Sequence, residues 1–122
     1  MANILIVDDS RTSRRVLRDI LERGGHSVVG EAVNGREGAD LYNNLKPDLV
    51  TMDITMPEMD GIESLKVIIS NDPHAKVVMV TAANQKQKMM EALKIGAVEF
   101  IAKPLDENAI IKTIDEVSEK KT

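Results

Sequence analysis

The chain has 122 residues, 43% hydrophobic and 30% charged, which excludes an intrinsically disordered protein and suffices for one domain with a hydrophobic core. It has no cysteine, which excludes disulfides and thiolate metal sites, and its net charge of −4 argues against nucleic-acid binding. No apolar run reaches the roughly 18 residues of a membrane span, and the N-terminus lacks a signal-peptide pattern. We therefore expect a cytoplasmic protein that binds neither nucleic acid nor membranes.

The chain opens with two predicted strands separated by a helix. Residues Ile4–Val7 form a continuous apolar run, which is typical of a central parallel strand covered on both faces. A helical stripe follows and ends at the glycine pair 24–25; its apolar members are Val16, Leu17, Ile20 and Leu21. Gly30 and Glu31 interrupt the next run, Val28–Val33, so we place this strand at an edge of the sheet.

The middle of the chain predicts two helices on either side of a strand. Asn34 and Glu37 have the spacing of a helix N-cap and its capping-box partner, and Pro47 prevents this helix from continuing. The run Asp48–Met52 is nearly continuous apolar and predicts a second central strand. A third helical stripe comes next, and its apolar members are Ile62, Leu65, Ile68 and Ile69.

The last third predicts two more strand–helix pairs. The strands are Val77–Val80, again a central type, and Val98–Ile101, and a helix between them ends near Gly96. Asp106 is expected to cap the final helix. The apolar residues of these helices are Met89, Met90 and Leu93, then Ile110, Ile114 and Val117. Five alternating strands and helices predict an α/β sandwich with a parallel sheet, forming one domain over residues 1–122.

Polar residues follow four of the five predicted strands. Asp8 and Asp9 follow the first, Asp53 the third, Thr81 the fourth and Lys103 the fifth. Ligands of such sheets bind beyond the carboxyl ends of the strands, so we expect these side chains to gather at one edge. Oxygen ligands without histidine or cysteine favour Mg²⁺ or Mn²⁺, and a carboxylate can form an aspartyl phosphate. The edge therefore predicts metal-assisted phosphoryl transfer.

Four motifs of this chain resemble those of the response regulator receiver domains of two-component systems. They occur in order and with the family's spacing: residues 4–10, 52–57 with Asp60 and Gly61, 80–82, and 100–104. Residues 30–32, 34–37 and 45–48 are most similar to the single-domain chemotaxis regulators of this family. The resemblance implies a flavodoxin-like (βα)5 three-layer sandwich with a parallel sheet of order 2-1-3-4-5.

The resemblance assigns the chemistry residue by residue. Asp53 is the phosphoacceptor, and Asp8 and Asp9 hold Mg²⁺, directly or through water, together with Asp53 and the backbone carbonyl of Thr55. Lys103 pairs with the phosphoryl group, and its bond to the following proline is expected to be cis.

The resemblance also implies a switch. The Thr81 hydroxyl moves toward the phosphate and the ring of Phe100 turns inward behind it, which changes a surface formed by the fourth and fifth helices and the fifth strand. The expected partners are a histidine kinase, a flagellar motor switch protein or another output protein, and a phosphatase. We expect a monomer without an attached output domain, since the chain ends at Thr122, just past the last helix.

Two other functions stay open from the sequence. One is a phosphorelay intermediate that passes its phosphoryl group to a histidine phosphotransfer protein. The other is a Mg²⁺-dependent phosphatase with an aspartyl-phosphate intermediate, although such enzymes usually carry a second aspartate where this chain has Thr55. We expect the chain to catalyse only its own phosphorylation and its autodephosphorylation, and not to turn over external substrates.

Two groups of residues outside these motifs remain. His26 and His74 lie in polar loop contexts, and we expect both to be solvated rather than to bind a metal. Arg11, Arg14 and Arg15 with Arg18 make the first helix basic, which suits either an ordinary charged face or a docking surface for an acidic kinase partner.

Overall fold

The computed structural model describes residues 1–119, where strands and helices alternate as the sequence predicts. The strands are β1 (Asn3–Val7), β2 (Ser27–Ala32), β3 (Leu49–Asp53), β4 (Val77–Thr81) and β5 (Glu99–Ala102). The helices are α1 (Arg11–Arg23), α2 (Gly35–Leu45), α3 (Gly61–Asn71), α4 (Lys86–Ile95) and α5 (Glu107–Glu119). Strand limits differ from the predicted ones by one residue at most. Residues 120–122 of the predicted domain lie outside the described part.

The strands form one parallel sheet in the order β2-β1-β3-β4-β5. This is the flavodoxin-like order that the family resemblance implies. The three nearly continuous apolar runs, β1, β3 and β4, are the central strands, and β2 lies at an edge as predicted. This order makes β1 and β3 direct neighbours, so the residues that follow them are brought together.

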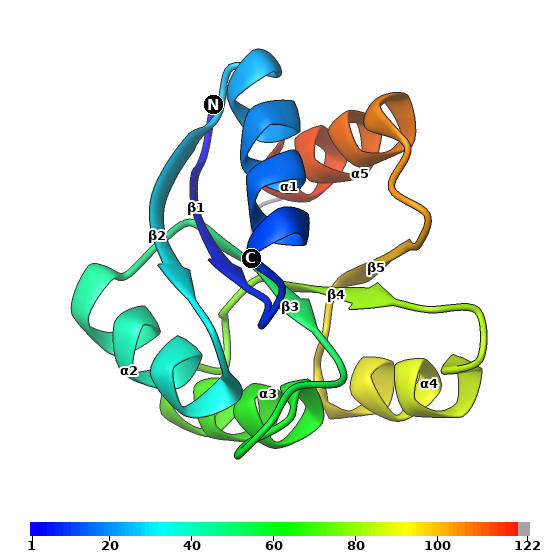
Figure 1. Ribbon diagram of the computed structural model, residues 1–122. Coiled ribbons are helices and arrows are strands. Elements are labelled where there is room, and N and C mark those ends of the chain that lie inside the picture. The colour runs from blue at the N-terminus through cyan, green and yellow to red at the C-terminus, as the bar shows by residue number, and fades with distance from the viewer. Residues whose placement is uncertain (120–122) are drawn as a thin grey trace.

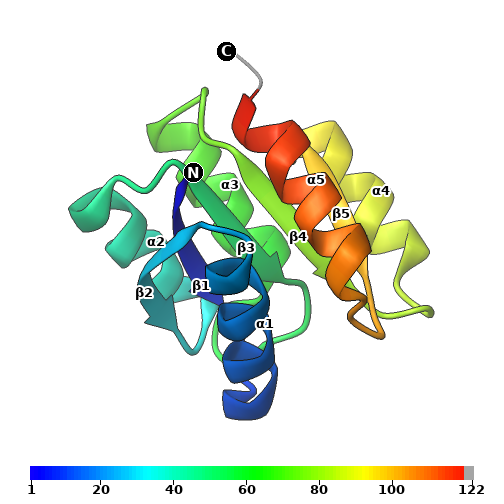
Figure 2. The same cartoon turned by 90° about the horizontal axis from the view of Figure 1, so that it is seen from above.

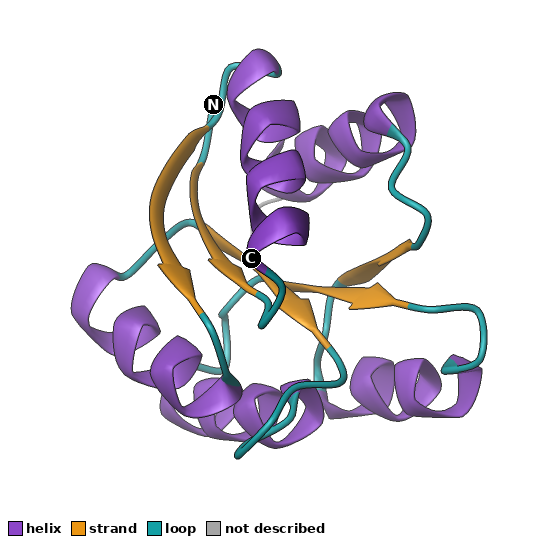
Figure 3. Ribbon diagram, in the orientation of Figure 1, coloured by secondary structure: helices purple, strands orange, loops and turns teal. Residues whose placement is uncertain are grey.

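Helices cover both faces of the sheet, which gives three layers. Figure 1 shows α1 and α5 on one face and α2, α3 and α4 on the other. Seen from above in Figure 2, α1 and α5 lie in front of the strands. Figure 3 separates the purple helical layers from the orange sheet between them. The helices cover the faces of the sheet, so the edge formed by the carboxyl ends of the strands is lined by the loops that follow them.

The side chains of each central strand alternate between two hydrophobic cores. On β1, Ile4 and Ile6 pack with residues of α1 and α5, whereas Leu5 and Val7 pack with residues of α2, α3 and α4. All four are at most 1% exposed. This period of two is that of a strand buried on both faces, which holds β1 rigidly beneath the site.

Some predicted burial is wrong. Val16 was expected on the buried stripe of α1, but 42% of its surface is exposed. For α4 the sequence predicts a helix without assigning its buried face; Met90 and Leu93 are exposed, and the fully buried residue is Ala92. Met89 lies one helical turn before Ala92 and packs against the same core, so the apolar contact face of α4 is narrow and turned away from Met90.

The prediction that His26 is solvated is also wrong. Only 5% of the residue is exposed. Its Nδ1 accepts a hydrogen bond from the Ala2 N–H at 3.0 Å, and its Nε2 lies 2.8 Å from a carboxylate oxygen of Asp115 on α5. These contacts are with residues far away in the sequence, so the polar neighbours of His26 in the chain misled the prediction. Within residues 1–119, no helix is long and apolar enough to span a membrane.

Candidate functional site

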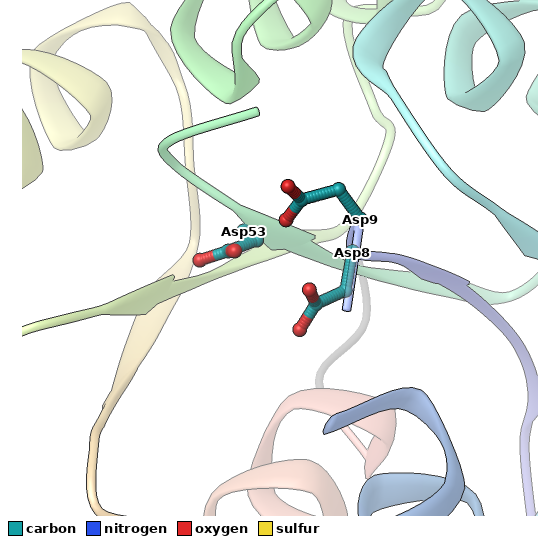
Figure 4. Close-up of side chains that lie close together, drawn as sticks. All are labelled: Asp8, Asp9 and Asp53. Carbon is teal, nitrogen blue, oxygen red and sulfur yellow. The ribbon is translucent and has the colours of Figure 1, made fainter. Parts of the chain in front are cut away.

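Three aspartates from two neighbouring strands meet at the carboxyl edge of the sheet. Asp8 and Asp9 follow β1, and Asp53 is the last residue of β3. Because β1 and β3 are parallel and pair directly, both strands end at the same edge. Figure 4 shows the three side chains lying close together there. The structure thus brings together the carboxylates that the sequence analysis selected.

The carboxylate groups are close enough to share one cation. One oxygen of each aspartate lies within 4.8 Å of the others. Asp8 and Asp53 are 5% and 6% exposed, and Asp9 is open to solvent. Two of the three negative charges are therefore removed from water at short range, an arrangement that is unfavourable without a neutralising partner.

Lys103 supplies part of the missing positive charge. Its Nζ lies 3.6 Å from Oδ1 of Asp53, and the Lys103–Pro104 peptide bond is cis as predicted. Burial and then the charge of Asp8 raise the pKa of Asp53 from 3.8 to about 6, although Lys103 and the Ile54 N–H act in the opposite direction. One ammonium group therefore neutralises only part of the field of three carboxylates.

Local hydrogen bonds fix the turn that carries Asp8 and Asp9. Ser10 is the N-cap of α1, its backbone N–H donates to the Asp8 carboxylate at 2.8 Å, and its hydroxyl accepts from the Ser13 N–H. Arg14 donates to the backbone carbonyl of Asp8 at 2.8 Å and to Glu31 at 2.9 Å. From the sequence, Arg14 was predicted to belong to a charged face or a docking surface, because its two partners are distant in the chain or belong to the backbone.

A close backbone approach fixes the loop after Asp53. Gly61 begins α3, and its N–H donates to the Ile54 carbonyl at 2.7 Å. A Cβ at this position would overlap the backbone carbonyl oxygen of Asp53, so a side chain cannot be placed there without moving the end of β3. Asp60 and Glu63 complete a capping box that holds the start of the helix.

The other predicted site residues lie around this cluster. Thr81 is the last residue of β4 and is buried, and Phe100 on β5 is half-buried against the core shared with α4. Asp53 accepts a hydrogen bond from the Ile54 N–H, whereas no hydrogen bond joins it to Thr81 among the described residues. Thr55 lies in the loop after β3, where its exposed side chain meets Gln85.

Sequence reasoning missed Gln85. Its Nε2 donates to the Thr55 hydroxyl oxygen, and its Oε1 accepts from the Ala82 N–H at 2.7 Å. Gln85 therefore joins the loop after β3 to the loop after β4. No periodic pattern marks this residue, and only its position four residues after Thr81 could have drawn attention to it.

The residues present fit a hard divalent cation. Ligand oxygens around Mg²⁺ at about 2.1 Å are separated by roughly 3 to 4 Å, and one oxygen of each carboxylate already lies within 4.8 Å of the others. The cluster contains oxygen ligands only, and two of its members are buried charges. An acidic cluster of this kind is typical of a magnesium site.

The family model for the response regulator receiver domain matches residues 4–115. The chain belongs to this family. A receiver domain is the phospho-acceptor module of two-component signalling, so the chain is a signalling switch rather than an enzyme that turns over external substrates.

Similar proteins cover nearly the whole receiver domain. The chain is 47% identical to the chemotaxis protein CheY of Thermotoga maritima over 94% of this chain and 96% of that one. It is 45% identical to the protein CcdB of Bacillus subtilis over 96% and 98%. The CheX–CheY–BeF3–Mg²⁺ complex of Borrelia burgdorferi contains a similar structure with a TM-score of 0.91 and 38% identity, covering 97% of this chain and 90% of that chain.

Proposed function

We propose that residues 1–122 form one cytoplasmic, monomeric receiver domain that a histidine kinase phosphorylates on Asp53 with Mg²⁺. The observation that carries this proposal is the cluster of Asp8, Asp9 and Asp53 with the Lys103 ammonium 3.6 Å from the Asp53 carboxylate. It combines a nucleophile, oxygen ligands for a cation and a group that can pair with a phosphoryl oxygen.

In the proposed transfer, an Asp53 oxygen attacks the phosphorus of a phosphohistidine. The P–N bond breaks, and the imidazole leaves with the bonding electrons and takes up a proton. Asp8 and Asp9 would hold Mg²⁺ together with Asp53 and the Thr55 carbonyl, and a bound ion would supply positive charge for the carboxylate and phosphoryl oxygens. Lys103 offers the remaining positive charge, while water later hydrolyses the acyl phosphate.

We assign the switch to Thr81 and Phe100. The strand pairing places Met79 opposite Phe100 and Thr81 two residues further along β4, so Thr81 and Phe100 have the parity of one sheet face. Movement of the Thr81 hydroxyl toward a phosphoryl group on Asp53 would open space on this face for the Phe100 ring. The surface of α4, β5 and α5 then changes for a partner.

Chemotaxis is the pathway we propose, with the flagellar motor switch as the partner that binds the phosphorylated form. A relative at 47% identity is named a chemotaxis protein, and the Borrelia complex contains a relative bound to a second protein called CheX. This complex also motivates our proposal of a phosphatase partner. The name of the Bacillus relative CcdB does not mention chemotaxis, so the phosphorelay role is the alternative.

Labelling with acetyl phosphate in Mg²⁺ tests the assignment of the nucleophile. Asp53→Asn should abolish an acid-stable, base-labile label, because the amide does not attack phosphorus. Asp40→Asn, which changes an exposed aspartate of α2, is the matched control and should be labelled like the parent. A persistent label on Asp53→Asn would contradict the choice of Asp53. Transfer of the label to a histidine phosphotransfer protein, without binding to the motor switch, would favour the relay.

A further inference from the structure

The Gln85 bridge, defined as the contacts of Gln85 with Thr55 and Ala82, joins the two loops that follow the central strands β3 and β4. Thr55 lies two residues after Asp53, and Ala82 follows Thr81 directly. Asp53 pairs with Val80 in the sheet, so both loops leave the same edge side by side. A single carboxamide thus connects the loop of the proposed phosphoacceptor with the loop of the proposed switch threonine.

The contacts of Gln85 differ from those that its position in α4 would favour. Gln85 is the N-cap residue of α4, yet its side chain makes no capping hydrogen bond to the helix. The carboxamide instead points away from the first turn, accepting from the Ala82 N–H and donating to Thr55. The N-terminus of α4 therefore lacks a side-chain cap, and the carboxamide that could supply it joins the two loops instead.

A groove lies between the loop after β3 and the loop after β4, and the Gln85 bridge crosses it. It has a volume of about 470 Å3 and is lined by Thr55 on one side and by residues 83–88 on the other. Thr55 is exposed and Gln85 is half-buried. The other residues of this loop that line the groove are exposed, so the contact of Gln85 with Thr55 is what limits the distance between the two loops.

We propose that Gln85 is a positioning residue that holds the loop after β4 in the arrangement where Thr81 does not contact Asp53. The observed arrangement has the bridge formed and no hydrogen bond between Thr81 and Asp53 among the described residues. In this proposal, Thr81 moves toward Asp53 together with the adjoining peptide group, so that the Ala82 N–H leaves the Gln85 carboxamide. The bridge therefore opposes the switch, and this inference rests on the proposed function.

Removal of the bridge should strengthen binding of a phosphoryl mimic. Gln85→Met keeps the length of the side chain and removes both hydrogen bonds. Since each neutral hydrogen bond contributes modestly, the apparent affinity for beryllofluoride in excess Mg²⁺ should rise about three- to tenfold, measured by titration calorimetry. Gln87→Met, an exposed residue lining the same groove, is the matched control and should bind like the parent.

A double-mutant cycle separates the bridge from other effects of the substitution. Thr55→Val removes the hydroxyl oxygen that accepts from Gln85 and keeps the backbone carbonyl assigned to the metal. In the Thr55→Val background, Gln85→Met should give a markedly smaller gain, because the contact between the loops is already absent. An equal gain in both backgrounds would contradict the proposed link.

The unfolding free energies of the same variants in urea distinguish positioning from a merely structural role. A structural role predicts a less stable Gln85→Met protein with the parent's beryllofluoride affinity, and this result would overturn the inference, as would weaker binding. If the parent itself does not bind beryllofluoride with Mg²⁺, the proposed function and the inference both fail. If the parent binds and Gln85→Met matches Gln87→Met, the inference alone fails.

Discussion

The two edges of the sheet treat charged and polar groups in opposite ways. At the carboxyl edge, Asp8, Asp9 and Asp53 crowd together with Lys103 as a partial counter-charge. At the amino edge, polar groups are paired: the Asn3 N–H donates to the Asp48 carboxylate at 2.8 Å, and the Ala2 N–H donates to His26. Paired polar groups at the amino edge therefore stabilise the fold, whereas the reactive groups lie at the carboxyl edge.

The polar groups at the two edges should contribute to the free energy of unfolding with opposite signs. Paired groups at the amino edge should contribute stability, because removal of one partner leaves a buried donor or charge without its contact. Crowded carboxylates at the carboxyl edge should reduce stability, because unfolding separates like charges that the folded chain holds together. Substitutions at the two edges should therefore change the unfolding free energy in opposite directions.

The largest effect is expected at His26. His26→Leu leaves the Ala2 N–H, on a residue that is 1% exposed, without its acceptor and removes the contact with Asp115. We expect a loss of about 2–3 kcal/mol in urea unfolding at pH 7. His74→Leu, at an exposed position in the loop after α3, is the control and should change stability by less than about 0.5 kcal/mol. Equal losses in both variants would show that the loss does not come from the contacts of His26 with Ala2 and Asp115.

A gain of stability is expected at Asp53. Its pKa is raised from 3.8 to about 6, so the folded state binds this proton more tightly than the unfolded state does. The charged Asp53 carboxylate therefore destabilises the folded state, and this destabilisation is absent below about pH 4 and fully present above about pH 6. In chelator at pH 7, Asp53→Asn should be more stable than the parent by roughly 1–2 kcal/mol, because the raised pKa is a net destabilisation of the charged carboxylate in which the attraction of Lys103 is already included.

The pH series of this variant tests the cause. The advantage of Asp53→Asn over the parent should shrink as the pH falls from about 6 to about 4, because protonation relieves the same repulsion. Urea unfolding of both proteins at several pH values measures the difference. An advantage that is constant with pH would show that the gain does not come from the charge of Asp53.

The smallest effect is expected at Tyr42, which lies on α2. Its hydroxyl donates to the Asp72 carboxylate at 2.6 Å, and burial raises the pKa of the phenol. Tyr42→Phe should lower the unfolding free energy by about 1 kcal/mol, less than a buried hydrogen bond to a carboxylate contributes, because Asp72 is only half-buried. Circular dichroism should follow this unfolding, because the substitution removes the chain's one tyrosine. A more stable Tyr42→Phe protein would contradict the view that these pairs hold the fold.

Much of the carboxyl edge could be predicted from the sequence, for a physical reason. Asp8, Asp53 and Thr81 each lie at the end of an apolar run, and parallel strands bring such ends to one edge. The strand order came from the family resemblance rather than from periodicity, which does not encode which strands are neighbours.

The remaining contacts depend on the folded arrangement. His26 reaches Asp115 across 89 positions of the chain, and Gln85 reaches Thr55 across 30. Arg14 binds a backbone carbonyl, which carries no residue-specific signal. On α4, the residue next to the core is the small Ala92 rather than the larger Met90, so hydrophobicity alone does not indicate which side of this helix is buried.

The most direct test of the central claim is urea unfolding of the parent and Asp9→Asn, in chelator and in excess Mg²⁺, at low salt and pH 7. We expect Asp9→Asn to be more stable than the parent in chelator by roughly 1–2 kcal/mol, since one charge leaves the cluster. Mg²⁺ should stabilise the parent more than the variant and narrow the gap, because the ion binds the folded cluster and the variant lacks one ligand. A variant no more stable than the parent in chelator, or a gap indifferent to Mg²⁺, would contradict one shared carboxylate site.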